Sequence, residues 1–426
     1  MQIHIKIRKK GKTKMTSTTT EFANGHAKTE VENLTLIVPE NADLLEQTTS
    51  KLAKKPTRQS FNSVTDVEVN IDAGARFVKA TINGSFVHFP SVYRVVDEAL
   101  PKNIPGCFTL DGVNYAAGKS AQFTEGELVT AANNNKIEKI HIWVLSALAH
   151  DRKLLKSLQN TKRRKSEPAR IRLNIRMLSL SSALESDIKA ALNQIEKFTW
   201  EGYDYLLQLG GWELQPEGYG AAIAVSSKYP ELNQFHLLDM GGGTLTLTQY
   251  SVIKYGSGIN EPCPSAPLVA NGGGIASIIE SIHIGLSKSD KSGVKIIPDL
   301  IQESLKSSSA KSVEYLYGNK PKNIYKSVNS ALGDWVEENP QVKRILTYSL
   351  AALLRKEAVF LTGGGFASEV VHEWVSSYLL KNVPNATLER LESSHEINVT
   401  GLAGLPSLVP AKRARKPKKA QQQPET

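Results

Sequence analysis

The sequence predicts an α/β protein in which two related domains flank one ligand cleft. Three observations carry the prediction: an acidic strand end followed by a glycine-bearing hairpin, a second hairpin of the same kind far along the chain, and a strand that leads through three glycines into a helix. Two such hairpins at a wide separation are typical of an internally duplicated fold. At 426 residues the chain is long enough for each half to bury its own core.

Composition narrows the class of protein. A hydrophobic fraction of 40% with 22% charged residues is ordinary for a soluble globular protein, and no apolar run reaches the roughly 18 residues of a membrane span. Cys107 and Cys263 stand far apart and have no partners at metal-ligand spacing, so neither a disulfide framework nor a zinc site is indicated. We therefore expect a soluble protein of the reducing cytoplasm.

The net charge of +10 belongs to the two ends of the chain. Segment 1–14 carries six lysines and arginines and no acid, and segment 412–426 carries six against one acid, which leaves the chain between them nearly neutral. Such basic ends could make weak direct contacts with nucleic acid or anionic lipid, but solvated tails are the plainer explanation.

Composition also suggests the domain boundaries. We expect a disordered, basic, Ser- and Thr-rich extension over 1–63 and a disordered basic tail over 410–426. No apolar segment follows the early basic residues, so a secretory signal is not expected, and Met15 is an alternative start. Between the tails we place a first domain over 64–232 and a second over 233–409, with the last helix returning to the first domain.

The first hairpin opens the ordered region. Apolar and polar residues alternate up to Asp72, a short connection over 73–76 follows, and strand character resumes over 77–82. Asn83-Gly84 is a strong second turn signal, so 85–89 is expected to return as a third antiparallel strand.

The chemistry of the first turn has the form Asp-x-Gly-x4-Lys. Gly74 lets the backbone approach a ligand closely, while Asp72 could hold Mg²⁺ through water and Lys79 could meet phosphate charge. Seen alone, the pattern also fits an ordinary hairpin with a capping Asp and a turn glycine.

A second site of the same type follows the short strand 236–240. Asp239 stands at the end of this strand, and Gly241-Gly242-Gly243-Thr244 leads into an alternating strand over 245–252. The recurrence of acid, glycine turn and strand favours phosphate binding over an ordinary turn, because both sites could serve one ligand.

A third element is the strand 358–361, followed by Thr362, three glycines and an expected helix through Tyr378. Strand, glycines and helix start make a surface on which backbone can lie against a nucleoside. Segment 271–274 (NGGG) opens an expected helix at Ile275 and is a weaker candidate for the same role.

These motifs, in this order, resemble those of the actin, Hsp70 and sugar-kinase superfamily, and within it the ParM-like plasmid segregation proteins. Segment 72–79 (DAGARFVK) resembles the first phosphate motif, 239–246 (DMGGGTLT) the second, and 361–365 (LTGGG) the adenosine motif. Segments 89–91 (FPS) and 115–118 (YAAG) resemble small-domain strands. The resemblance covers about 64–409 and implies two RNase H-like domains of an actin-like ATPase, which binds ATP or GTP with Mg²⁺.

The resemblance also assigns the site. In ParM-like proteins the segment similar to 215–221 (QPEGYGA) connects the domains, and its Glu orients the attacking water, which makes Glu217 the expected catalytic residue. An acid at a helix N-terminus is the structural alternative. Asp72 and Asp239 are expected to hold Mg²⁺, mainly through water. The expected nucleotide-binding residues are Asp72, Gly74, Lys79, Asp239, Gly241, Gly242, Gly243, Thr244, Gly363, Gly364 and Gly365.

Function follows from the resemblance as an expectation. It implies an ATPase that polymerises into nucleotide-dependent filaments and moves plasmid DNA through an adaptor bound to a centromere-like site. Thr246 replaces an acid that ParM-like proteins usually carry near the hydrolytic water, so hydrolysis is expected to be slow or to depend on polymerisation. The alternatives are a cytoskeletal filament without DNA cargo, a scaffold with degenerate ATPase activity, and a sugar kinase; a chaperone is disfavoured because little chain follows Gly365.

Overall fold

The computed structural model describes residues 64–131, 137–160, 167–179, 182–255, 260–289, 295–309, 311–318 and 320–409. All of them belong to one unit, Phe61–Thr426. The expected extension over 1–63 and the basic tail over 410–426 lie outside the described residues. None of the helices in the described ranges combines the length and apolarity needed to cross a bilayer.

The first sheet starts from the predicted hairpins. β1 (Thr65–Ala73), β2 (Phe77–Ile82) and β3 (Ser85–Pro90) form an antiparallel meander, and β8 (Ala169–Ser179) then pairs with β1 in parallel. β10 (Tyr203–Pro216) continues the sheet in parallel to β8. The rest of the sheet is antiparallel and consists of β9 (Lys197–Trp200), β5 (Cys107–Leu110), β6 (Val113–Ala117), β4 (Val92–Val96) and β7 (Leu128–Thr130).

The second sheet repeats the order of the first. β11 (Gln234–Met240) and β12 (Thr244–Lys254) form a hairpin, and β17 (Ala358–Thr362) pairs with β11 in parallel. Both sheets therefore place an antiparallel meander beside parallel strands, which confirms the predicted duplication of an α/β fold. The sheet is completed by β13 (Asn260–Pro264) and β14 (Leu268–Asn271), which both pair with β12, and by β18 (Leu388–Arg390), which pairs with β17.

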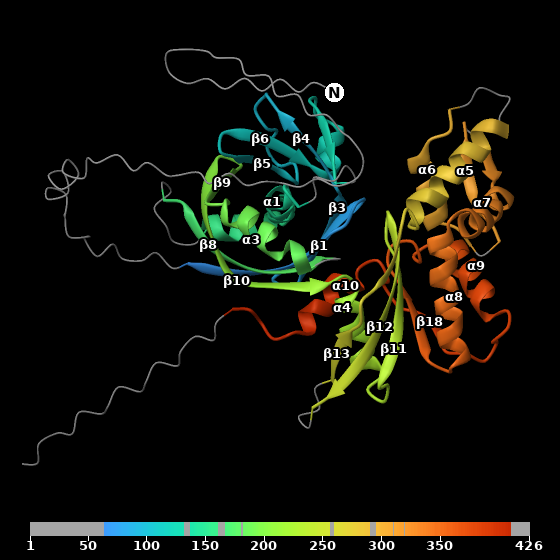
Figure 1. Ribbon diagram of the computed structural model, residues 1–426. Coiled ribbons are helices and arrows are strands. Elements are labelled where there is room, and N and C mark those ends of the chain that lie inside the picture. Colours follow the sequence, from blue (N-terminus) through green and yellow to red (C-terminus); the bar gives the residue numbers. More distant parts are fainter. Residues whose placement is uncertain are drawn as a thin grey trace, which may run out of the picture. The chain divides into compact units, whose positions relative to one another are not determined.

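Helices cover both sheets (Figure 1). Nearly every residue of α1 (Ile140–His150) is buried, because this helix packs among strands of the first sheet and other helices. α8 (Pro340–Leu354) packs on the second sheet, and its first turn is capped by the Asn339 side chain. The other described helices are α2 (Arg152–Asn160), α3 (Glu185–Asn193), α4 (Tyr219–Lys228), α5 (Ile275–Ser289), α6 (Pro298–Lys306), α7 (Tyr325–Glu338), α9 (Glu369–Leu380), α10 (Ile397–Thr400), and the 3₁₀ turns η1 (Gly118–Gln122), η2 (Ser182–Leu184) and η3 (Gly401–Gly404); β15 (Glu314–Tyr317) and β16 (Lys320–Asn323) form a separate hairpin.

The end of the described chain is fixed to the first sheet by one arginine. Arg176 of β8 is 1% exposed, and its guanidinium donates to the Glu213 carboxylate at 2.6 Å and to the Pro406 carbonyl at 2.8 Å. It also donates to the Leu402 carbonyl at 3.4 Å. Segment 402–406, which follows α10, is therefore bound to a strand of the first sheet through a buried charge whose donors are satisfied.

Two short helical elements cross where the two halves are connected. A Cβ placed on Gly220 of α4 would lie 1.9 Å from the Asn398 carbonyl oxygen, and one placed on Gly401 would lie 2.0 Å from the Gly220 carbonyl oxygen. Because both clashes are with backbone atoms, neither can be relieved by a side-chain rotation. The crossing of α4 with the junction of α10 and η3 therefore requires glycine on both sides.

We expect Gly220→Ala to lower the free energy of unfolding by about 1–3 kcal/mol, because the added methyl group forces two backbones apart. Urea unfolding followed by circular dichroism measures the change. The matched control is Gly285→Ala, since Gly285 lies inside α5 with open space around it. That control should gain up to about 1 kcal/mol, because alanine is the better helix former. Equal stability of the two variants would contradict the close backbone crossing.

Candidate functional site

The carboxyl ends of strands from both sheets meet at a cavity of about 480 Å³. This volume falls within the usual range of small-molecule sites, about 300–1,000 Å³. Ligands of open α/β sheets commonly bind outside the carboxyl ends of the strands, which is where this cavity lies. Its lining includes Asp72 from the end of β1, Glu217 after β10, Asp239 from β11, Gly363 after β17, Lys306 from the end of α6 and His395.

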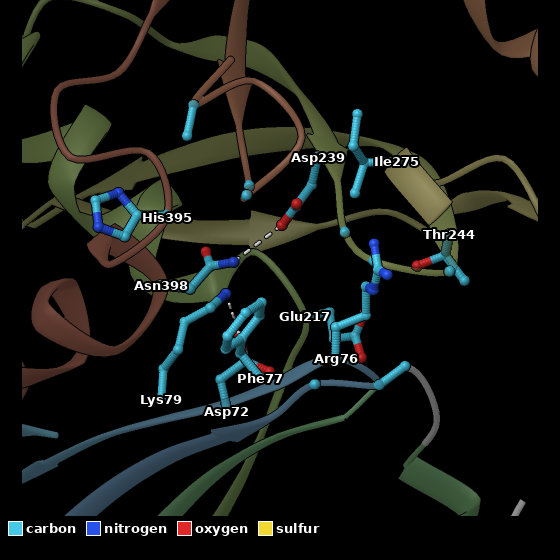
Figure 2. A pocket seen from close by; sticks show the side chains of 18 of the residues that line it. Asp72, Arg76, Phe77, Lys79, Glu217, Asp239, Thr244, Ile275, His395 and Asn398 are labelled. Atoms are coloured by element: carbon cyan, nitrogen blue, oxygen red, sulfur yellow. Dashed lines mark hydrogen bonds and ion pairs between the residues drawn. The ribbon is translucent and has the colours of Figure 1, made fainter. Parts of the chain in front are cut away.

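The first glycine turn connects β1 to β2 and faces the cavity. Asp72 and Lys79 are paired across the hairpin, so that the Lys79 ammonium donates to the Asp72 carboxylate at 3.2 Å (Figure 2). The Ser91 hydroxyl, itself buried, donates to the Gly74 carbonyl at 2.6 Å. This hydrogen bond from Ser91 fixes the backbone of the turn, while the Asp72 and Lys79 side chains point into the cavity.

The environment of Lys79 keeps it charged. Burial alone would lower the pKa of its ammonium, but the nearby carboxylates of Asp72, Asp239 and Glu217 outweigh burial, and its pKa is raised. A permanent positive charge therefore faces the cavity, although it is partly balanced by Asp72.

Asp239 approaches the cavity from the second sheet. The Asn398 side-chain amide of α10 donates to the Asp239 carboxylate at 2.9 Å, as Figure 2 shows. Burial and the like charge of Asp72 raise the pKa of Asp239, against the opposing effects of Asn398 and Lys79. A buried carboxylate with a raised pKa gains most from a cation, because binding a cation restores the stabilisation that burial removed.

The second glycine turn is held by the start of α5. The Gly241 amide donates to the Thr244 carbonyl at 2.9 Å, and the first residue of α5, Ile275, donates its amide to the Gly241 carbonyl at 3.1 Å. Gly241, Gly242, Gly243 and Thr244 all line the cavity, as does Ile275. Segment 271–274 is absent from that lining, so its part here is to support the turn.

The three glycines after β17 have different surroundings. Gly363 adopts a φ of +93°, and a Cβ on it would lie 2.2 Å from the Asp239 carboxylate, so no other residue fits without strain. Gly363 and Gly364 line the cavity, whereas Gly365 packs on the Met240 side chain and does not. The helix expected after them, α9, begins at Glu369.

Glu217 lies in the connection between β10 and α4. Its amide donates to the Ser179 carbonyl at 3.1 Å, and Gly218 beside it adopts a φ of +84°. The predicted helix after Glu217 exists as α4, and Pro216 is the last residue of β10. Thr246, which pairs with Asp239 across the β11–β12 hairpin, lines the same cavity. Glu217 and Thr246 thus both line the cavity.

The cavity collects every predicted site residue except Gly365. Sequence reasoning did not single out Arg76 or His395, which line the cavity, or Asn398, which binds Asp239. Arg76 lies inside the first phosphate motif, where its charge was a signal that could have been used. Nothing near Asn398 in the sequence points to Asp239.

The donor set fits a hydrated Mg²⁺ ion. Two carboxylates, Asp72 and Asp239, face the cavity from opposite sheets, and the Asn398 side-chain oxygen is buried without a hydrogen-bond partner among the described residues. Oxygen ligands of this kind, together with waters and ligand phosphates, are the usual environment of Mg²⁺ in phosphate-binding sites.

Comparison with known proteins identifies the fold. No family model matches the chain, and no curated protein matches its sequence. Many solved structures match in fold, among them the following three. The archaeal actin homolog Ta0583 aligns with a TM-score of 0.57 and 18% identity over 79% of this chain and 97% of its own. A ParM filament from Clostridium botulinum gives 0.53 and 14% over 79% and 98%. MreB5 of Spiroplasma citri, bound to ADP, gives 0.52 and 14% over 80% and 95%.

The three structural alignments indicate the same fold. All three comparisons cover nearly the whole of the known chain and about four-fifths of this one. Because the sequence identities are low, the structural likeness establishes the fold alone. The chain has the actin-like fold.

Proposed function

We propose that this protein is an actin-like ATPase that polymerises into nucleotide-dependent filaments. The observation that carries the proposal is the convergence of Asp72, Glu217 and Asp239, from separate strand ends, on one cavity with two glycine turns. Binding and hydrolysis of a triphosphate need cations, close backbone approach and a positioned water. The two aspartates would hold the metal cation, the glycine turns allow close backbone approach, and Glu217 would position the water.

The residues have distinct roles in this proposal. Asp72 and Asp239 would hold Mg²⁺, mainly through water, and Lys79 would meet the phosphate charge. Gly74, the turn 241–244 and Gly363–Gly364 form the backbone walls on which the nucleotide lies, and Gly365 supports them by packing on Met240. Bound Mg²⁺ would neutralise the negative charge of the phosphates while this charge shifts toward the leaving group.

Glu217 orients the attacking water. Its carboxylate accepts a hydrogen bond from the water, whose oxygen attacks the terminal phosphorus while the bond to the bridging oxygen breaks. The diphosphate leaves with that electron pair, one proton of the water stays on the product phosphate, and the other is released to solvent. Thr246 offers a neutral hydroxyl near this position, so we expect turnover to be slow in single subunits.

Filament formation and DNA segregation rest on fold analogy. Among the neighbours is a ParM filament, and the proposed partners here are further copies of this chain, with an adaptor on centromere-like DNA as the link to cargo. The basic tail over 410–426 would then make accessory contacts with DNA, and the protein would act in the cytoplasm. A filament without DNA cargo, or a scaffold with degenerate ATPase activity, is the second candidate, because Thr246 stands in the cavity where an acid is usual.

The test is sedimentation and phosphate release with the full chain. We expect pelleting filaments with Mg-ATP, few with Mg-ADP and none without nucleotide, together with phosphate release that rises with polymer mass. Parallel samples with Mg-GTP determine the preferred base. Nucleotide-dependent pelleting without phosphate release would favour the scaffold, and the absence of both nucleotide binding and pelleting would refute the proposal.

A further inference from the structure

Arg76 is a cation in the cavity lining to which the proposed function gives no role. It lies in the turn between β1 and β2, three residues before Lys79, and lines the cavity with the phosphate-binding candidates. No hydrogen bond or ion pair of its side chain is present among the described residues, and its Nη1 nitrogen is buried without an acceptor. A buried guanidinium nitrogen without an acceptor is costly, so the arrangement suggests that an anion completes it.

The side chain of Arg76 reaches across to the other glycine turn. A Cβ on Gly242 would lie 2.6 Å from Cγ of Arg76 and 3.1 Å from its Cδ, so the aliphatic part of the arginine rests directly on the Gly242 backbone. Figure 2 shows its guanidinium on the side of the cavity near Thr244 and Ile275. The residue thus belongs to one phosphate turn and is positioned by the other.

The other cations of the cavity are already engaged. Lys79 donates to Asp72, and the Lys306 ammonium lies 5.3 Å from the centre of the Phe77 ring. Burial and the nearby Lys79 lower the pKa of His88 to about 4, which leaves that imidazole neutral near pH 7. Burial is the main influence on the pKa of Arg76 and lowers it, and the Asp299 carboxylate opposes this effect without forming an ion pair with it; an arginine starts so far above neutrality that it stays charged. Among the described lining residues, Arg76 is therefore the cation most available to a ligand.

We propose that Arg76 binds the terminal phosphate of a nucleoside triphosphate and makes the site discriminate triphosphate from diphosphate. This inference rests on the proposed function. Asp72, Asp239 and Glu217 bring three carboxylates to the lining. Mg²⁺ and Lys79 can offset part of this negative charge, but the additional charge of a third phosphate needs a further cation. A guanidinium seated over Gly242 supplies it, with a planar fork that matches phosphate oxygens.

The test compares binding of Mg-ADP and of a non-hydrolysable Mg-ATP analogue by calorimetry with the full chain. Arg76→Gln should weaken the triphosphate analogue about 10- to 100-fold, as expected for the loss of a charged hydrogen-bond partner. The affinity for ADP should change by less than about threefold. Arg76→Lys should fall between wild type and Arg76→Gln, because it keeps the charge and loses the fork.

The control is Arg172→Gln, which removes a partly exposed arginine that pairs with Asp66 outside the cavity lining. It should leave both affinities unchanged, and thermal unfolding midpoints of all variants report whether they fold. Equal weakening of both nucleotides by Arg76→Gln, or no weakening of either, would overturn the role of Arg76 and leave the proposed function standing. Failure of the wild-type chain to bind either nucleotide would instead overturn the proposed function.

Discussion

Asp239→Asn is expected to weaken Mg-nucleotide binding by about 100-fold, an effect at the upper end of those measured when groups around a bound metal are removed. The substitution keeps the shape of the side chain and an oxygen that can accept the Asn398 hydrogen bond, but it removes the charge that faces Asp72 across the cavity. Calorimetric titration with Mg-ATP measures the loss. Unchanged affinity would contradict a role for Asp239 in metal or nucleotide binding.

The same variant should not be less stable when no nucleotide is present. The pKa of Asp239 is raised in the folded protein, chiefly by burial, so the folded state holds its proton more tightly than the unfolded chain does. The stability due to this group is therefore present below the unfolded pKa and lost as the pH rises through the folded pKa. Above the folded pKa the ionised carboxylate disfavours folding, and asparagine removes that penalty.

Thermal unfolding separates a lost site from a lost fold. Without ligand, the melting temperature of Asp239→Asn should equal or exceed that of wild type, and added Mg-ATP should raise only the wild-type value. Asp334→Asn, an exposed substitution on α7, is the control and should behave as wild type. A large fall in the melting temperature of Asp239→Asn would show that the carboxylate is structural.

Glu217→Ala is expected to separate nucleotide binding from turnover. The proposed phosphate and Mg²⁺ contacts come from other residues, so binding and assembly should survive. Loss of the group that orients the water should slow phosphate release by about 10²- to 10⁴-fold. Subunits would then keep their triphosphate, and filaments formed after a pulse of ATP should last longer by light scattering.

The control for this experiment is Glu196→Ala, because Glu196 is an exposed carboxylate beside β9 and outside the cavity lining. It should release phosphate at the wild-type rate. If Glu217→Ala also does so, Glu217 has no part in the reaction, and another polar group near Thr246 becomes the candidate.

Local patterns predicted much of the fold. Alternation up to Asp72, a glycine turn and a lysine seven residues later sufficed to predict β1 and β2, and Asp72 and Lys79 line the same cavity. The repetition of the pattern at Asp239 predicted the duplication. These features depend on neighbours in sequence, and the physical rules for hairpins are themselves local.

Local sequence patterns could not predict the contacts between segments that are far apart in the sequence. Asn398 binds Asp239 from a position 159 residues away, and no periodicity connects them. Gly363 and Gly365 are equivalent in the sequence pattern, yet one faces the cavity and the other packs on Met240, because the direction of the loop is set by tertiary packing. The burial of Arg76 likewise depends on Gly242 of the other sheet.

The anchoring of the C-terminal segment by Arg176 has a mechanical consequence. The chain runs from Asn398, which touches the candidate site, through the carbonyls of Leu402 and Pro406 that Arg176 holds, and on to Ser407, which donates to the Glu68 carboxylate at 2.9 Å. A pulling force applied to the tail beyond Val409 would reach these anchors before it reached Asn398. Tension would therefore pass into β1 and β8 of the first sheet, and a load could be carried by the tail while the nucleotide contacts stay unstressed.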